Sequence, residues 1–138
     1  MNSKLRGRVA AVVVPAMAGA ALLAAGGTAA AYGKDGYLEN QEFGLYYLTD
    51  RSGCVFDIVR EDYNFNDDKF TGPAGCHGRT DWTNDNTESY WNRHWLTWKV
   101  ATDAGIDGNV GTIPEAYWGN ASSTFKNKIS SADYILGT

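Results

Sequence analysis

The stretch from Trp82 to His94, WTNDNTESYWNRH, sets small oxygen-bearing side chains among large aromatic ones. Asn84, Asp85 and Glu88 carry amide and carboxylate oxygens, which are the ligands that calcium prefers. The flanking aromatic rings could instead stack on sugars, and Asn and Asp are also frequent in tight turns. The residue types therefore leave three alternatives open: a metal loop, a sugar-binding surface, and a turn between two strands.

Residues that could carry catalysis do not form a recognisable group. The two histidines, His77 and His94, have no motif neighbour such as a second histidine at helical spacing. The serine-rich segment 121–125 lacks the glycines of a nucleophile elbow. Four carboxylates could serve glycoside hydrolysis, but nothing in the sequence sets their separation: Glu61, Asp62, Asp67 and Asp68. We therefore expect a protein that is not an enzyme.

The first 31 residues have the order of a secretory signal peptide. Three basic residues between positions 4 and 8 precede the apolar run Val9–Leu23 and a small-residue stretch that ends at Ala31. A membrane anchor fits less well, because the run is rich in Ala and Gly and has no stop-transfer pattern. We expect cleavage after Ala31 and an exported single domain, residues 32–138, that acts outside the cell as a monomer without a membrane span.

Charge and cysteine content narrow the partners further. All 16 acidic residues follow Ala31, whereas three of the 12 basic residues precede it. The exported part is therefore strongly acidic, which argues against nucleic acid as a partner. Its two cysteines, Cys54 and Cys76, are expected to form a disulfide that stabilises the fold by roughly 3 kcal/mol. Zinc bound by these cysteines and the two histidines is the alternative, but their spacing differs from that of zinc fingers.

Strands are the elements expected to position these residues. The segment FGLYYLTDRSGCVFDI alternates as a strand at 43–48, a turn at 49–53 and a strand at 54–58. The segment WLTWKVATDAGIDGNVGTI repeats this design, with alternation from Trp95 onward and a last strand at 110–113. Helical periodicity is weak, apart from one turn near 114–117. The sequence predicts an all-β domain.

The two hairpin segments also align with each other, which indicates an internal duplication. We expect repeat one at about 40–94 and repeat two at about 95–135, packed as two sheets. The aligned pairs, with a two-residue insertion in the second turn, are Leu45 with Trp98, Tyr47 with Val100, Gly53 with Gly108, Ile58 with Ile113, and Ser89 with Ser131.

A repeated hairpin followed by an Asn-containing stretch that ends in Ser resembles the βγ-crystallin double Greek key. More narrowly, EFGLYYLTDRSG, NDNTESYWN and KNKISSA resemble the secreted bacterial peptidase inhibitors of the Streptomyces metalloproteinase inhibitor type. The resemblance covers about residues 40–135. It implies a βγ-crystallin-like double Greek-key β-sandwich, and a non-enzymatic inhibitor whose partner is an extracellular zinc protease.

The resemblance also implies a role for the stretch from Trp82 to His94. In βγ-crystallins two Asn/Asp residues, two free positions, Ser/Thr and Ser close the Greek key, and many members bind calcium there. Glu88 and Lys126 depart from this pattern, and an ammonium group opposes a cation, so we expect weak, roughly millimolar calcium binding at most and no other cofactor. The alternative is a turn tied down by Asn and Ser, with Trp82, Tyr90 and Phe125 as core residues beneath it. The matching positions are Asn84, Asp85 and Ser89 in the first copy, and Asn127, Ser130 and Ser131 in the second.

The family's inhibitor presents its reactive bond on an extended, cysteine-pinned loop of the second half. The matching segment here, 101–109, is short, acidic and without cysteine. The segment beside the expected disulfide is our first candidate for the inhibitory loop, because a tethered loop loses little freedom on docking. Its alternative role is a Gly-rich surface connection. It comprises Gly72, Pro73, Ala74, Gly75, Cys76, His77, Gly78 and Arg79.

Two other functions stay open. One is a calcium-responsive or structural extracellular βγ-crystallin module. The other is a carbohydrate-binding module, in which Trp91, Trp95 or Trp118 would stack on sugar rings. Trp95 is the strongest of these three, because the alternation places it opposite the core side chains of its segment.

Overall fold

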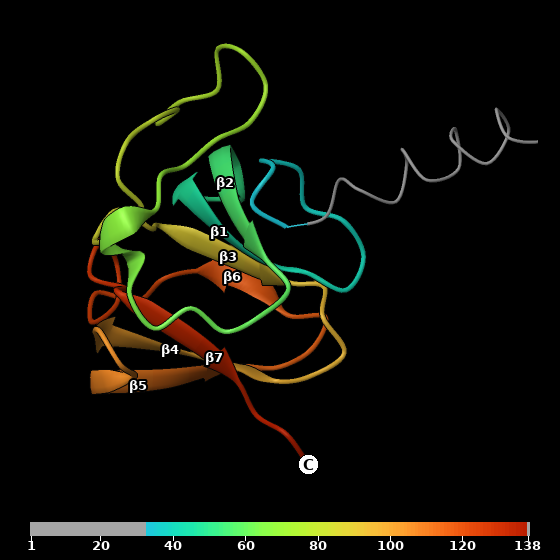
Figure 1. The fold of residues 1–138 in the computed structure, drawn as a ribbon, viewed down its shortest axis with the longest axis vertical. Coiled ribbons are helices and arrows are strands. Elements are labelled where there is room, and N and C mark those ends of the chain that lie inside the picture. The colour runs from blue at the N-terminus through green and yellow to red at the C-terminus, as the bar shows by residue number, and fades with distance from the viewer. Residues whose placement is uncertain (1–32, 138) are drawn as a thin grey trace, which may run out of the picture. The chain divides into compact units, whose positions relative to one another are not determined.

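A computed structural model describes residues 33–137 of the chain (Figure 1). The expected signal peptide, residues 1–31, lies outside the described residues. The chain divides into two units at Tyr32, and the unit from Gly33 onward folds as two antiparallel sheets. Within the described part, no helix has the length and apolar character needed to cross a membrane.

One sheet has the strand order β2-β1-β3-β6 and the other has the order β5-β4-β7, and Figure 1 shows them as separate layers. The predicted all-β class is therefore confirmed. The only helical element among residues 33–137 is the short 3₁₀ turn η1, Phe65–Asp67. The strands are β1 (Phe43–Leu48), β2 (Ser52–Ile58), β3 (Ser89–Asn92), β4 (Trp98–Asp103), β5 (Asp107–Ile113), β6 (Trp118–Asn120) and β7 (Ser131–Tyr134).

Strand β1 has the predicted bounds, whereas the other predicted strands begin elsewhere. β2 and β5 start earlier than expected because their ladders continue into the hairpin turns. β4 begins at Trp98 rather than at Trp95, because side chains form hydrogen bonds with the backbone of the residues that precede the strand. The Asn92 amide donates to the carbonyl of Leu96 (2.8 Å), and the Leu96 N–H donates to Nδ1 of His94 (3.1 Å). Residues 114–117 form a turn and not a helix.

The strand register corrects the predicted alignment of the repeats. Phe43 pairs with Ile58, and Trp98 pairs with Ile113. Phe43 therefore corresponds to Trp98, and the two hairpins match throughout without any insertion. The predicted equivalence of Leu45 with Trp98, and of Tyr47 with Val100, was wrong by two positions, because similar short strands align almost equally well in either register.

The two repeats exchange their third segments, and this exchange builds the double Greek key. β6 belongs to the second repeat but pairs with β3 in the first sheet. Conversely, Asp62 of the first repeat forms a bridge with Ala132 of β7 in the second sheet. Each repeat therefore completes the sheet of the other, so neither can form its full sheet alone.

The core lies between the two sheets, where equivalent residues of the two repeats meet. The rings of Phe43 and Trp98 stack at 4.7 Å between centroids, with an interplanar angle of 11°, and both are fully buried. The other members of the core are Leu45, Cys54, Phe56, Ile58, Phe65, Phe70, Val100, Ile113, Ile129 and Ala132.

Two buried carboxylates attach the segment that precedes β1. The Glu42 oxygens accept hydrogen bonds from the N–H groups of Gly33 (2.6 Å) and Glu39 (2.7 Å). Asp57 accepts in the same way from Gly36 (2.8 Å). Burial raises the pKa of Glu42 to about 7 and that of Asp57 to about 6, against the lowering effect of these donors.

Stability should therefore fall as the pH rises through the folded pKa of Glu42. The pKa of this carboxyl is raised in the fold, so its contribution is fully present below its ordinary value of 4.5 and is lost on passing about 7. We expect the free energy of unfolding of the wild type, measured relative to that of Glu42→Gln, to decrease between pH 5 and pH 8. Chemical denaturation across this range checks it. Two parallel pH profiles would contradict the assignment.

Candidate functional site

The final serine of each Asn-containing stretch ties down its own hairpin. Ser89 Oγ accepts from the N–H of Arg51 (2.9 Å) and donates to the carbonyl of Leu48 (2.6 Å). Ser131 Oγ accepts from the N–H of Ile106 (3.0 Å) and donates to the carbonyl of Asp103 (2.6 Å). Both serines are fully buried. These two residues of the predicted motif thus have a structural role that explains their presence without a metal.

The rest of each motif is paired across the two repeats. Asp85 and Asn127 both take left-handed backbone conformations, with φ of 62° and 57°. The Asp85 N–H donates to the carbonyl of Ile129 (3.1 Å), and the Asn127 N–H donates to the carbonyl of Thr87 (2.8 Å). The two stretches therefore hold each other in place, and each candidate cation position draws on both repeats.

Because each stretch pairs with the other, the two residues that depart from the motif, Glu88 and Lys126, lie at the same candidate cation position. Asn127 Nδ2 donates to Glu88 (3.3 Å), and Lys126 Nζ lies 3.8 Å from the same carboxylate. At the other position both residues, Asp85 and Ser130, match the motif. They are in contact, because Ser130 donates to Oδ1 of Asp85 (3.1 Å). Glu88 and Lys126 thus neutralise each other at one position and leave the other unchanged.

The donor set at the Asp85 position fits a weak cation site. Asp85 supplies a carboxylate and Ser130 a hydroxyl, and the buried Oδ1 of the adjacent Asn84 has no hydrogen-bond partner within the described part. Oxygen donors of this kind suit calcium, but one carboxylate gives little charge. Among residues 33–137, no three or more His, Cys, Asp or Glu side chains gather to hold a metal.

The predicted disulfide between Cys54 and Cys76 is confirmed, with their Cα atoms 5.2 Å apart. The bond uses both thiols, and the described residues contain no free cysteine, so zinc binding by these sulfurs is excluded. His77 is exposed on the loop, whereas His94 is buried against Trp98 and Tyr134.

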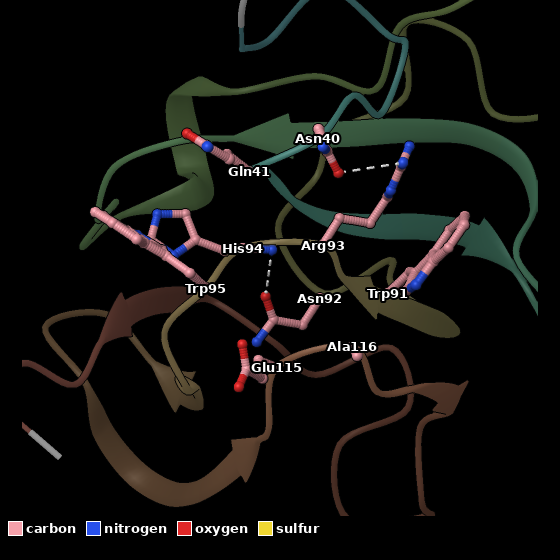
Figure 2. Close-up of a pocket in the computed structure, with 9 residues that line it drawn as sticks. All are labelled: Asn40, Gln41, Trp91, Asn92, Arg93, His94, Trp95, Glu115 and Ala116. Atoms are coloured by element: carbon pink, nitrogen blue, oxygen red, sulfur yellow. Dashed lines mark hydrogen bonds between the residues drawn. The ribbon is translucent and has the colours of Figure 1, made fainter.

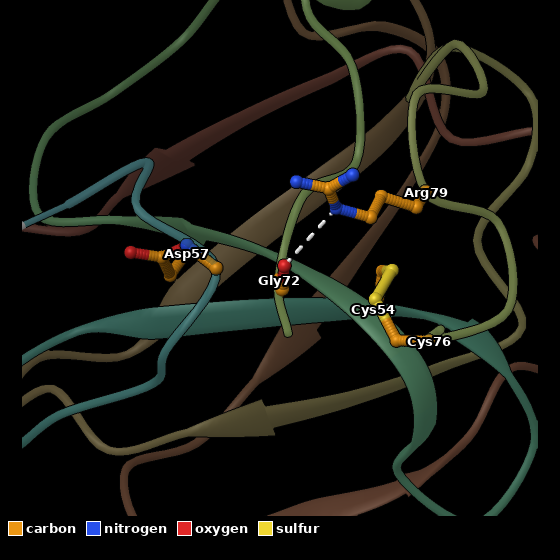
Figure 3. The surroundings of a disulfide bond; sticks show 6 residues. Cys54, Asp57, Gly72, Cys76 and Arg79 are labelled. Atoms are coloured by element: carbon orange, nitrogen blue, oxygen red, sulfur yellow. Dashed lines mark hydrogen bonds between the residues drawn. A yellow bond between two sulfur atoms is a disulfide. The ribbon is translucent and has the colours of Figure 1, made fainter. Parts of the chain in front are cut away.

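The candidate loop Gly72–Arg79 is largely exposed and is fixed at several points. The Cys54 N–H donates to the carbonyl of His77 (2.9 Å). Arg79 Nε reaches back to the carbonyl of Gly72 (3.2 Å) beside the disulfide, as Figure 3 shows. The segment is folded into two successive turns rather than extended, because Cys76 donates to Pro73 and Arg79 donates to Cys76.

The segment 101–109, at the position where the resemblance implies the reactive bond, does not form a presented loop. Its residues belong to strands β4 and β5, which leaves only 104–106 as the turn between them. The backbone at this turn is held by Ser131 through Ile106. The geometry therefore favours Gly72–Arg79 over the segment at the position that the resemblance implies.

One tryptophan, Trp82, occupies a different environment from that predicted. Trp82 was expected in the core, but 52% of it is exposed, and it lies under the ammonium group of Lys69 (4.4 Å from the ring). Tyr90 and Phe125, which were expected beside it, do pack against the core. The Arg51 guanidinium lies over the rings of both Trp91 and Trp118, at 4.6 and 3.9 Å from their centres.

An open cleft of about 390 Å³ lies where the chain passes from β3 to β4. Figure 2 shows Trp95 and His94 at one end of this cleft, with Trp91 at the other and Arg93 between them. Sequence reasoning singled out Trp91 and Trp95 but missed the polar residues around them, because these come from separate segments of the chain. The lining residues are Asn40, Gln41, Trp91, Asn92, Arg93, His94, Trp95, Glu115 and Ala116.

Comparison with known proteins supports the fold. No family model matches the chain, and no curated protein matches it. A solved structure from work on the evolution of the eye lens βγ-crystallin domain fold matches with a TM-score of 0.55 and 18% sequence identity, and the match covers 72% of this chain and 89% of that chain. The predicted βγ-crystallin fold is thus confirmed, while the narrower resemblance to bacterial metalloproteinase inhibitors stays a prediction.

Proposed function

We propose that this protein is an exported, non-enzymatic binding module that inhibits an extracellular zinc protease through the loop Gly72–Arg79. The observation that carries the proposal is an exposed loop held by a disulfide and by hydrogen bonds at both ends. A loop already fixed in this way loses little conformational entropy on binding. The signal-like leader and the disulfide both suit an extracellular role.

Close contacts with neighbouring segments restrict the loop further. A side chain at Gly36 would meet the backbone of Gly72 at 2.5 Å, and a side chain at Gly78 would overlap the ring of Tyr47. The chain therefore uses glycine where the loop touches the segment before β1 and the end of β1. These close contacts hold the loop in place, so a protease that binds it would meet a rigid surface.

The contact with the protease would be made by a turn and an imidazole, not by a substrate-like extended strand. The two successive turns prevent the loop from pairing with an active-site strand along its whole length. Cys76 cannot bind the catalytic zinc because its sulfur is in the disulfide. The exposed His77 is then the loop side chain best suited to zinc, since neutral imidazole is a common ligand of this metal.

Inhibition assays against thermolysin-like zinc proteases test this proposal. We expect the wild type to inhibit, and His77→Ala to weaken inhibition at least tenfold, because it removes the proposed zinc ligand. Ile106→Gly, in the excluded hairpin turn, is the matched control and should inhibit normally. Circular dichroism should show both variants folded.

Replacing both cysteines by serine should also weaken inhibition, because the loop loses its anchor and becomes a substrate. Mass spectrometry would then find cleavage within 72–79. If the intact protein inhibits no zinc protease, or if Ile106→Gly alone abolishes inhibition, the proposal is wrong.

A second candidate function, calcium-responsive stabilisation, is favoured by one specific observation. The two residues that depart from the family motif, Glu88 and Lys126, pair with each other. They therefore leave the candidate calcium position formed by Asp85 and Ser130 unchanged. A cation there would join one residue of each repeat. Binding only to the folded state would raise the melting temperature in proportion to occupancy.

Calcium should therefore bind with a dissociation constant of roughly 10⁻⁴–10⁻³ M, the class of extracellular modules. We expect millimolar calcium to raise the melting temperature of the wild type and of Glu88→Gln, but not that of Asp85→Ala. Calorimetry and thermal unfolding with and without chelator measure both effects. An equal response in Asp85→Ala, or none in the wild type, would remove this candidate.

A further inference from the structure

We propose that the cleft beside Trp95 binds a neutral carbohydrate, with one sugar ring stacked on the Trp95 indole. This site is separate from the loop Gly72–Arg79, and it does not depend on protease inhibition. Its volume of about 390 Å³ falls within the range of small-molecule sites, about 300–1,000 Å³. Aromatic faces together with planar polar groups are the features that recognise sugars, because a sugar ring has an apolar face and a rim of hydroxyl groups.

Trp95 is exposed yet held on a rigid turn. Its side chain is 64% exposed, more than any other tryptophan of the described part. The turn beneath it is fixed by Asn92, whose amide donates to the carbonyls of Leu96 (2.8 Å) and Ile113 (3.0 Å). Asn92 Oδ1 also accepts from the N–H of His94 (2.9 Å). The backbone that carries this exposed ring is thus fixed in advance, so binding of a ligand need not order the loop.

The His94 ring supports this platform from below. It contacts Trp95 edge-on at 5.5 Å and stacks on Tyr134 at 5.8 Å, while its Nδ1 accepts from the Leu96 N–H. An accepting Nδ1 requires a ring that carries no proton on that nitrogen, and burial lowers the pKa of His94 accordingly. The imidazole is thus a neutral support for the Trp95 ring.

Two strained residues clamp the floor of the cleft from opposite sides. Gln41 and Ala116 have φ of 72° and 67°, a left-handed conformation that is uncommon for residues other than glycine. The Gln41 N–H donates to the carbonyl of Arg93, and the Ala116 N–H donates to the carbonyl of Asn92, both at 2.9 Å. Such strained residues persist only where the surrounding structure over-determines them, and they are frequent at ligand sites.

The polar groups of the cleft suit hydroxyl groups rather than a charged ligand. The Arg93 guanidinium is fixed by the carbonyl of Leu38 (3.0 Å) and lies 4.9 Å from the Trp91 ring. Glu115, also in the lining, has an exposed carboxylate that makes no ion pair within residues 33–137. Because Arg93 is positive and Glu115 is negative, the cleft has little net charge. Together the two side chains offer both hydrogen-bond donors and an acceptor.

The other tryptophans in this region are less suited to stacking. Trp91 has the guanidinium groups of Arg51 and Arg93 over its ring, and Trp118 has Arg51 at 3.9 Å. These contacts occupy ring surface that a sugar would need. Trp95 has no cation over its ring among the described residues, and therefore it is the stacking platform to which the proposal commits.

Retention on insoluble polysaccharides tests the proposal directly. Chitin, cellulose and mannan serve as neutral probes, and alginate beads serve as an anionic probe. We expect at least one neutral polysaccharide to retain the wild type, and Trp95→Ala to reduce retention at least tenfold. Trp82→Ala removes a similarly exposed tryptophan outside the cleft, so it should be retained like the wild type.

Two further variants separate binding from folding. Trp95→Phe keeps an aromatic face and should keep part of the retention, whereas Glu115→Gln should weaken retention without changing the melting temperature. The soluble oligosaccharide of the retaining polysaccharide should quench or shift tryptophan fluorescence in the wild type but not in Trp95→Ala. The proposal is overturned if no neutral polysaccharide retains the protein, if alginate alone does so, or if Trp82→Ala loses as much retention as Trp95→Ala.

Discussion

The stack of Phe43 on Trp98 is the contact on which the rest of the structure depends. These two residues occupy equivalent positions of the two repeats, at the start of β1 and of β4, and neither is exposed. The stack joins the two sheets at the point where the repeats face each other. Because β6 and the Asp62 segment cross to the opposite sheet, the stack and the strand exchange reinforce each other. One half alone would expose an aromatic face and an incomplete sheet.

The candidate binding regions depend on this junction to different degrees. The Asp85 and Asn127 positions need both repeats, since each stretch donates a backbone hydrogen bond to the other. The floor of the Trp95 cleft is the connection from β3 to β4, and it leads directly into Trp98. The loop Gly72–Arg79 depends mainly on the first repeat, through the disulfide to β2. Loss of the junction would therefore disturb the first two regions more than the loop.

The sequence could predict the features that depend on local pattern. The alternation of Phe43 and Leu45 marked β1, and the expected export of a chain with two cysteines predicted the disulfide. The strands β3, β6 and β7 were missed because three or four residues are too few to establish an alternation. Trp82 was assigned to the core because aromatic residues are usually buried there, but its position opposite Lys69 exposes it.

Features that combine distant segments lay beyond sequence reasoning. The pairing of Glu88 with Lys126 could not be seen, because nothing local indicates that each motif completes the other. The same holds for the cleft, where Gln41, Arg93 and Glu115 come from three separate segments. The placement of Trp95 away from the core was correctly predicted, but the residue lies on a turn fixed by Asn92 and not on a strand. Asn92 itself gave no signal, since a buried asparagine looks like any surface residue in a sequence.

Equilibrium unfolding of Phe43→Ala, followed by tryptophan fluorescence and by far-ultraviolet circular dichroism, tests the central role of the stack most directly. Removing a fully buried ring from the junction should cost about 3–5 kcal/mol, and the two signals should still change together, because the repeats fold as one interlocked unit. Phe43→Leu, which keeps most of the apolar volume, should cost less. A loss below about 1 kcal/mol, or two separate transitions in the wild type, would contradict the account.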